Sequence, residues 1–303
     1  MGLFHCPLGA IYRDDEPCID CGLCEARTKE EAVEASKKIR EYLQAHAARP
    51  STVKKIAICG KGGVGKSTVV TLMTNVLREE RYQILTVDTD ESNPGLGRML
   101  GIDGEPTPLV SLLGRLTEEE EVERTGFLAR DEITVSDIPK EFFIEKNNLK
   151  FLITGKIIDP FEGCACSMAD VVREFLIKLI LQEKEMVVID MEAGVESFGR
   201  GVERSVDTVL TIVEPSFESI ALAEKIKYMA DGIGVATVRA LLNKIPNEEI
   251  EKKIRDKLRE KNIDSLGTIY YNLEVNEAGF EGYAIGDSQA KEDMRSIVRT
   301  LLN

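Results

Sequence analysis

From residue 54 onward, short apolar runs alternate with longer segments in which apolar residues recur every three or four positions. Runs of about four to eight apolar residues between polar turns are typical of strands buried on both faces, whereas the longer period is typical of helices that cover a sheet. The alternation predicts an α/β fold with a mostly parallel sheet flanked by helices. The predicted strands are 56–59, 84–87, 151–153, 186–189, 209–213, 238–242 and 268–271.

The first fifty residues follow a different pattern. Thr28 and Glu31 have the spacing of a capping box, and the apolar residues after them recur at helical spacing, which predicts a helix over 29–45. Pro50 cannot continue that helix, so a linker follows it. We therefore expect two domains, a small N-terminal unit at 1–49 and the α/β domain at 54–303.

Composition limits the classes of partner. The chain has 53 acidic and 39 basic residues and a net charge of −14, and it lacks a run rich in Lys or Arg. Nucleic acids and anionic membranes both select a cationic face, so we expect neither as a partner. The sequence has no apolar stretch of about 18 residues and no secretory leader pattern, which predicts a cytoplasmic protein. The apolar residues at 294–302 lie on one helical face, which we expect to dock on the core.

Four of the seven cysteines lie near the N-terminus, at Cys6, Cys18, Cys21 and Cys24. A cubane cluster accepts three thiolates from one tight loop and a fourth from elsewhere, whereas structural zinc usually takes two separate pairs. The spacing therefore favours one [4Fe–4S] cluster held by these four cysteines, with a zinc knuckle as the alternative. Cys6 precedes a proline, and the arrangement resembles one half of a two-cluster ferredoxin.

A glycine-rich segment lies between the first predicted strand and a long helical stretch. It comprises Gly60, Lys61, Gly62, Gly63, Val64, Gly65, Lys66, Ser67 and Thr68. The segment matches the phosphate-binding pattern G-x-x-x-x-G-K-[ST] in the strand–loop–helix context that this pattern requires. Backbone N–H groups and the helix N-terminus would surround the phosphates, Lys66 would neutralise the β and γ oxygens, and Ser67 would ligate Mg²⁺.

Lys61 is a second lysine that a single phosphate loop does not need. Its presence resembles the deviant-Walker family, which includes the nitrogenase iron protein, the MinD and ParA ATPases and metallochaperone ATPases. The resemblance implies an ATP-dependent homodimer in which Lys61 reaches the nucleotide of the other subunit. A solvated loop lysine is the alternative.

The same resemblance assigns roles to carboxylates at the ends of two predicted strands. It implies that Asp90 positions the attacking water, that Asp88 supports the Mg²⁺ shell and that Asp190 is the Walker B acid. Asn243 and Lys244 follow another strand, where the family places its base-recognition asparagine. Pro246 stands where a guanine-reading N-K-x-D pattern has aspartate, which favours ATP over GTP.

Cys164 and Cys166 form a C-x-C pair before Ser167, which we expect to begin the cap of a helix. A helix N-terminus favours thiolates, and an extended pair at this spacing directs both sulfurs to one side. Two ligands rarely suffice for a soft divalent metal, so two chains would have to combine their pairs into one four-thiolate site. Two buried structural thiols are the alternative.

Residues 54–303 resemble CooC-type ATPases, which insert nickel during maturation of carbon monoxide dehydrogenase. The segments that carry the resemblance are 163–166, 190–196, 199–201, 213–216 and 243–244. The resemblance implies Ni²⁺, or Zn²⁺ in its place, at the C-x-C site and delivery to carbon monoxide dehydrogenase or acetyl-CoA synthase. The N-terminal cysteines depart from this family, so a reductive activator with ATP-gated electron transfer, similar to the nitrogenase iron protein, is the alternative function.

Overall fold

The structure is a computed structural model that describes residues 26–46, 53–90, 95–113, 126–155, 165–195, 205–235 and 237–303. The strands are β1 Lys55–Gly60, β2 Gln83–Asp88, β3 Ile133–Thr134, β4 Ile144–Lys146, β5 Leu149–Ile153, β6 Leu179–Ile180, β7 Glu185–Asp190, β8 Thr208–Val213, β9 Thr237–Ile245 and β10 Ser265–Tyr270. The helices are α1 Lys29–His46, α2 Lys66–Glu79, α3 Leu96–Met99, α4 Ala165–Lys178, α6 Phe217–Gly232, α7 Glu248–Glu260, α8 Leu273–Glu281 and α9 Gln289–Leu302.

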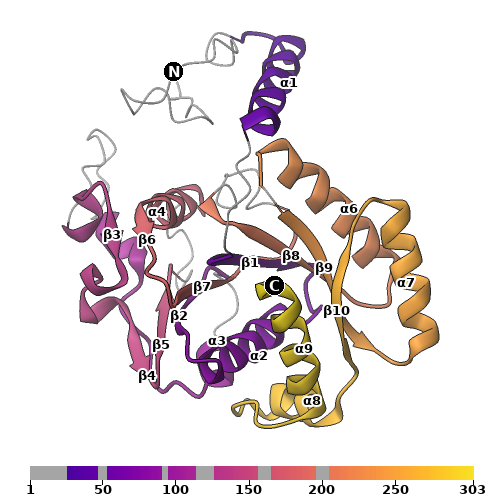
Figure 1. Cartoon of the computed structure of the whole chain (residues 1–303). Coiled ribbons are helices and arrows are strands. Elements are labelled where there is room, and N and C mark those ends of the chain that lie inside the picture. The colour runs from indigo at the N-terminus through magenta and orange to yellow at the C-terminus, as the bar shows by residue number, and fades with distance from the viewer. Residues whose placement is uncertain are drawn as a thin grey trace.

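An eight-stranded sheet in the order β10-β9-β8-β1-β7-β2-β5-β4 forms the centre of the α/β domain (Figure 1). Its strands pair in parallel except for β4, which runs antiparallel to β5 at one edge. This is the mostly parallel sheet flanked by helices that the sequence predicts, and each predicted strand is present. β3, β4 and β6 were not predicted, because strands of two or three residues carry too little periodicity.

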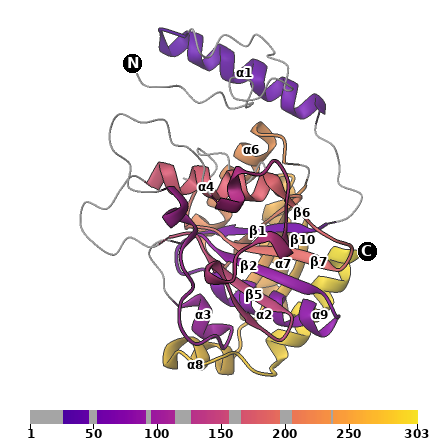
Figure 2. The ribbon, with the colours of Figure 1, turned by 90° about the vertical axis from the view of Figure 1, so that its left-hand side faces the viewer.

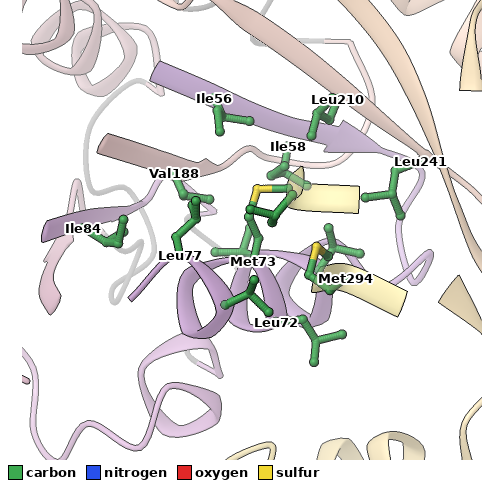
Figure 3. Packing of buried hydrophobic residues seen from close by; sticks show 14 of the residues in the cluster. Ile56, Ile58, Leu72, Met73, Leu77, Ile84, Val188, Leu210, Leu241 and Met294 are labelled. Atoms are coloured by element: carbon green, nitrogen blue, oxygen red, sulfur yellow. The ribbon is translucent and has the colours of Figure 1, made fainter. Parts of the chain in front are cut away.

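Side chains of alternate residues of β1 enter different cores. Ile56 and Ile58 pack with α2 and α9 on one face of the sheet, as Figure 3 shows, whereas Ala57 and Cys59 pack with α4 and α6 on the other. This alternation follows from the two-residue period of a strand. Burial on both faces explains why the strand is apolar throughout.

The C-terminal helix α9 packs on the core. Met294, Ile297, Val298 and Leu301 are buried in the cluster that also contains the apolar face of α2. The predicted docking of this helix is therefore confirmed. Among the described residues, no helix combines the length and the apolar composition that a transmembrane span requires.

Helix α1 lies against α6, outside the sheet (Figure 2). The predicted capping box is present, because the Glu31 N–H donates to Thr28 Oγ1 at 3.1 Å and the Thr28 N–H donates to Glu31 Oε2 at 3.0 Å. Ala35 and Ile39, on its apolar face, are buried. The four cysteines that precede this helix lie outside the described residues.

Candidate nucleotide site

The phosphate loop follows β1 at the carboxyl edge of the sheet and leads directly into α2. Gly65 has φ +96°, and a Cβ there would lie 2.4 Å from Asn243 Nδ2. A Cβ on Gly60, where φ is +151°, would lie 2.9 Å from the Ile212 carbonyl oxygen. Both positions therefore require glycine. The resulting loop presents the N-terminus of α2, where free N–H groups and the helix dipole bind anions.

Three predicted carboxylates lie together beside this loop. Asp88 and Asp190 end neighbouring strands and are partners in the β2–β7 register. The Asp90 N–H donates to Asp88 Oδ1 at 3.0 Å, which fixes the turn after β2. All three aspartates are buried, as is Lys66 at the start of α2. The fold thus brings residues separated by more than a hundred positions to one edge of the sheet, as ligand sites of open α/β sheets require.

Asp190 has a strongly altered acidity. Complete burial raises its pKa, a hydrogen bond from the Ser67 side chain and the charge of Lys66 lower it, and the charges of Asp88 and Asp90 raise it further, so that the pKa is about 7. Its Oδ1 is buried and accepts no hydrogen bond from the described residues. A buried carboxylate oxygen without a donor favours a cation.

The donor set suits Mg²⁺. Carboxylate and hydroxyl oxygens are the ligands that this hard cation prefers. Ser67 and Asp190 already face one another, and Asp88 lies in register beside Asp190. When bound with nucleotide, Mg²⁺ would supply charge neutralisation at the phosphates.

The segment after β7 is bonded to the phosphate-loop strand. The Met191 N–H donates to the Ile58 carbonyl and the Gly194 N–H donates to the Gly60 carbonyl, each at 3.1 Å. The Thr89 N–H donates to the Asp190 carbonyl at 3.0 Å, which links the two acidic turns. Backbone hydrogen bonds therefore tie both acidic turns to the strand that leads into the phosphate loop.

Asn243 and Lys244 contact the phosphate loop directly. The Asn243 side-chain amide donates to the Val64 carbonyl at 2.9 Å, and Lys244 Nζ donates to the Gly63 carbonyl at 2.6 Å. Lys244 has φ +58°, a rare conformation for a lysine. Both residues brace the loop. Base recognition by Asn243 stays a prediction.

Lys61 forms an ion pair within its own chain. Lys61 Nζ donates to Glu214 Oε1 at 3.1 Å. Glu214 is not among the site residues predicted from the sequence, although its position after an apolar strand was a usable signal. That Lys61 reaches the nucleotide of a second subunit stays a prediction.

A cleft of about 630 Å³ opens beside the loop. One wall contains Lys66, Ser67 and Asp90, and the other contains residues from the end of β10 and from α8, including Asn276 and Phe280. This second wall was not predicted from the sequence. The one sequence feature that indicates this wall is Asn272, a residue type that favours helix N-caps. Its side chain caps α8 by accepting a hydrogen bond from the Val275 N–H.

The C-x-C segment differs from the prediction in one respect. Helix α4 begins at Ala165, so Cys166 lies in its first turn and Ser167 does not start the cap. The prediction of an extended pair before the helix is therefore wrong for Cys166. The helix begins earlier because Ala165 and the residues after it contain no proline or glycine that would delay it. Cys164 lies outside the described residues.

Residues 55–285 match the family described as CobQ/CobB/MinD/ParA nucleotide binding domain. The chain belongs to this family. It is a P-loop ATPase, in agreement with the loop, the buried carboxylates and the cleft described above.

Similar proteins extend this comparison. An uncharacterized ATP-binding protein of Methanocaldococcus jannaschii is 39% identical over 242 residues, which cover 75% of this chain and 92% of that protein. The carbon monoxide dehydrogenase accessory protein CooC of Rhodospirillum rubrum is 32% identical over 240 residues, which cover 77% of this chain and 89% of CooC. The MinD cell division protein of Aquifex aeolicus shares the fold, with a TM-score of 0.58 and 20% identity over 82% of this chain and 96% of MinD.

Proposed function

We propose that this ATPase is a cytoplasmic metallochaperone that binds nickel and inserts it into carbon monoxide dehydrogenase or acetyl-CoA synthase. The similarity to CooC over most of both chains carries this proposal. The second lysine of the phosphate loop and the C-x-C pair support it, because they are the features that distinguish the predicted dimeric metal carrier from a simple nucleotide-binding domain.

The proposed hydrolytic roles follow from the nucleotide site. Lys66 binds the β and γ phosphates of ATP, and Ser67 with Asp88 and Asp190 supports Mg²⁺. Asp90, beside Asp88, orients the attacking water. Lys61 completes the nucleotide site of the partner in a homodimer. The burial of the three aspartates supports these roles, because charges that develop on the phosphates are stabilised most where water is excluded.

The proposed cargo site combines Cys164 and Cys166 from each of two subunits. Four thiolates suit Ni²⁺ or Zn²⁺, whereas one pair supplies too few ligands. The placement of Cys166 in the first turn of α4 supports thiolate character, since a helix N-terminus favours negative charge. ATP and metal would then both favour the dimer, and hydrolysis would release the metal to the client.

We propose that residues 1–49 form a separate unit and that Cys6, Cys18, Cys21 and Cys24 hold a [4Fe–4S] cluster in it. The four cysteines also favour a second function, ATP-gated electron transfer to a client enzyme. The packing of α1 against α6 supports that alternative. Helix α1 follows the four cysteines in the sequence, and α6 begins three residues after Glu214, which pairs with Lys61 of the phosphate loop. The N-terminal unit therefore contacts a helix that is directly connected to the nucleotide site.

Anaerobic purification followed by iron, sulfide and nickel analysis tests both functions. We expect four iron atoms per chain and one tightly bound nickel per ATP-bound dimer. Replacement of Cys164 and Cys166 by alanine should abolish nickel binding and leave the brown chromophore. A matched control is Cys59→Ala, which removes a buried thiol from β1.

The outcomes separate the two functions. A cluster without nickel binding in the wild-type protein contradicts the metallochaperone and favours ATP-gated electron transfer. Loss of the chromophore in the Cys164/Cys166 variant places the cluster at the C-x-C site instead. A colourless protein with bound zinc at the N-terminal cysteines contradicts the cluster.

A further inference from the structure

The carboxylate of Glu214 lies between two lysines of the nucleotide site. Its Oε1 accepts from Lys61 Nζ at 3.1 Å, and its Oε2 lies 3.9 Å from Lys244 Nζ. The Glu214 side chain is 19% exposed, whereas those of Lys61 and Lys244 are 39% and 43% exposed. Solvent therefore reaches both lysine side chains more readily than the carboxylate that holds them.

The backbone at Glu214 is fixed by the start of α6. The Glu214 N–H donates to Ser219 Oγ at 3.1 Å, and the Ser219 N–H donates to the side chain of Ser216, the N-cap, at 3.2 Å. Ser219 itself is buried. The lysines have long flexible stems, whereas the carboxylate is attached to a turn that hydrogen bonds hold in place. A rearrangement of this cluster is therefore expected to move the lysines.

Lys61 is not among the described residues that line the cleft, although Gly62 and Gly63 beside it are. In this structure the ammonium group of Lys61 is thus paired with Glu214, and Lys61 does not line the cleft. In the proposed homodimer, a nucleoside triphosphate bound at the phosphate loop of the partner subunit brings several negative charges toward Lys61, and these phosphates compete with Glu214 for the lysine.

We infer that Glu214 is a positioning residue that retains Lys61 until a nucleoside triphosphate draws it away. Lys61 is then available to phosphate oxygens only after the ion pair with Glu214 has broken. The ion pair opposes nucleotide binding by the free energy needed to break it. This inference rests on the proposed nucleotide-dependent homodimer and not on nickel, so it and the proposed nickel binding can fail separately.

Equilibrium titration of the full-length protein with the Mg²⁺ complex of ATPγS tests the inference. Glu214→Gln removes the charge but preserves the size of the side chain. We expect tighter binding by about two- to fivefold, the range that one partly exposed ion pair allows. Glu218→Gln, at an exposed position in the first turn of α6, is the matched control and should bind as the wild type does.

A double-mutant cycle separates retention of Lys61 from simple repulsion of phosphate by Glu214. In the Lys61→Ala background, Glu214→Gln should give no further gain. An equal gain in that background overturns the inference, because the carboxylate then acts on the ligand directly. Unchanged or weaker binding by Glu214→Gln also overturns it. If that variant does not fold, Glu214→Asp withdraws the carboxylate by one methylene and should give a smaller gain; no gain overturns the inference.

Discussion

The side-chain amide of Asn243 donates a 2.9 Å hydrogen bond to the carbonyl of Val64, although the two residues are 179 positions apart. The bond joins β9 to the phosphate loop in a buried setting. Removal of one partner leaves a buried carbonyl without a donor. The shape of the loop therefore depends on a strand that is distant in the sequence.

Replacement of Asn243 by alanine should weaken nucleotide binding. Loss of one buried hydrogen bond costs about 1–1.5 kcal/mol, which corresponds to roughly a tenfold loss of affinity at most. We expect tripolyphosphate to lose affinity as well as ATP, because the brace acts on the phosphate loop. Calorimetric titration with both ligands measures this. Asn247→Ala removes the cap of α7 and should leave both affinities unchanged; a loss for ATP alone contradicts the brace.

Replacement of Gly65 by alanine should abolish measurable nucleotide binding. The new Cβ would lie 2.4 Å from Asn243 Nδ2, and φ +96° is strained for any L-residue with a side chain. Strain of this kind costs about 1–3 kcal/mol, so the melting temperature should fall as well. Gly286→Ala is the matched control, since a Cβ at that position would have no neighbour within 4 Å among the described residues. Normal binding by Gly65→Ala would show that the loop can adopt another shape.

Lys66 and Asp90 should be essential for turnover, for different reasons. Lys66→Ala removes the buried cation at the phosphates and should abolish both tight nucleotide binding and hydrolysis. Asp90→Ala should abolish phosphate release but leave a dimer locked around ATP. Phosphate-release assays and light scattering with ATP measure the two outcomes. Asp103→Ala, at an exposed position, is the control; turnover by Asp90→Ala contradicts its role toward water.

Asp190 should make the protein without nucleotide and Mg²⁺ less stable as the pH rises. Its pKa is about 7 in the folded state, against an ordinary value of 3.8. At any pH between these two values, the folded state therefore holds a proton that the unfolded state has released. Stability therefore falls with pH across that window and levels off above pH 7, with a slope of at most about 1.4 kcal/mol per pH unit from this group.

Asp190→Asn mimics the protonated side chain and removes this dependence. In EDTA, the free energy of unfolding of Asp190→Asn should exceed that of the wild type by an amount that grows between pH 5 and pH 7. Urea unfolding of both proteins at each pH measures this difference. Asp103→Asn changes an exposed carboxyl group and should leave the difference constant. Parallel curves for wild type and Asp190→Asn would mean that the carboxyl group titrates in its ordinary range.

Local patterns in the sequence predict part of the site. The phosphate loop and the aspartates at strand ends have fixed spacing and physical roles, so their positions at the carboxyl edge follow from the parallel sheet. Contacts between distant segments carry no such spacing. The ion pair of Lys61 with Glu214 and the bond of Asn243 to Val64 depend on strand order, which places β8 and β9 beyond β1. The sequence does not predict that α8 lines the nucleotide cleft, for the same reason.

The close approach of α9 to β10 at Gly267 should limit side-chain size there. A Cβ on Gly267 would lie 2.4 Å from Ile297 Cγ1, and Ile297 is buried in the core shared with α2. Gly267→Ala should therefore lower the free energy of unfolding by about 1–3 kcal/mol, as overpacked cores do. Ile297→Ala removes the opposing atoms. It should therefore lower the free energy of unfolding less in the Gly267→Ala background than in the wild type. Urea unfolding of the four proteins gives this coupling, and purely additive losses would show that α9 moves away freely.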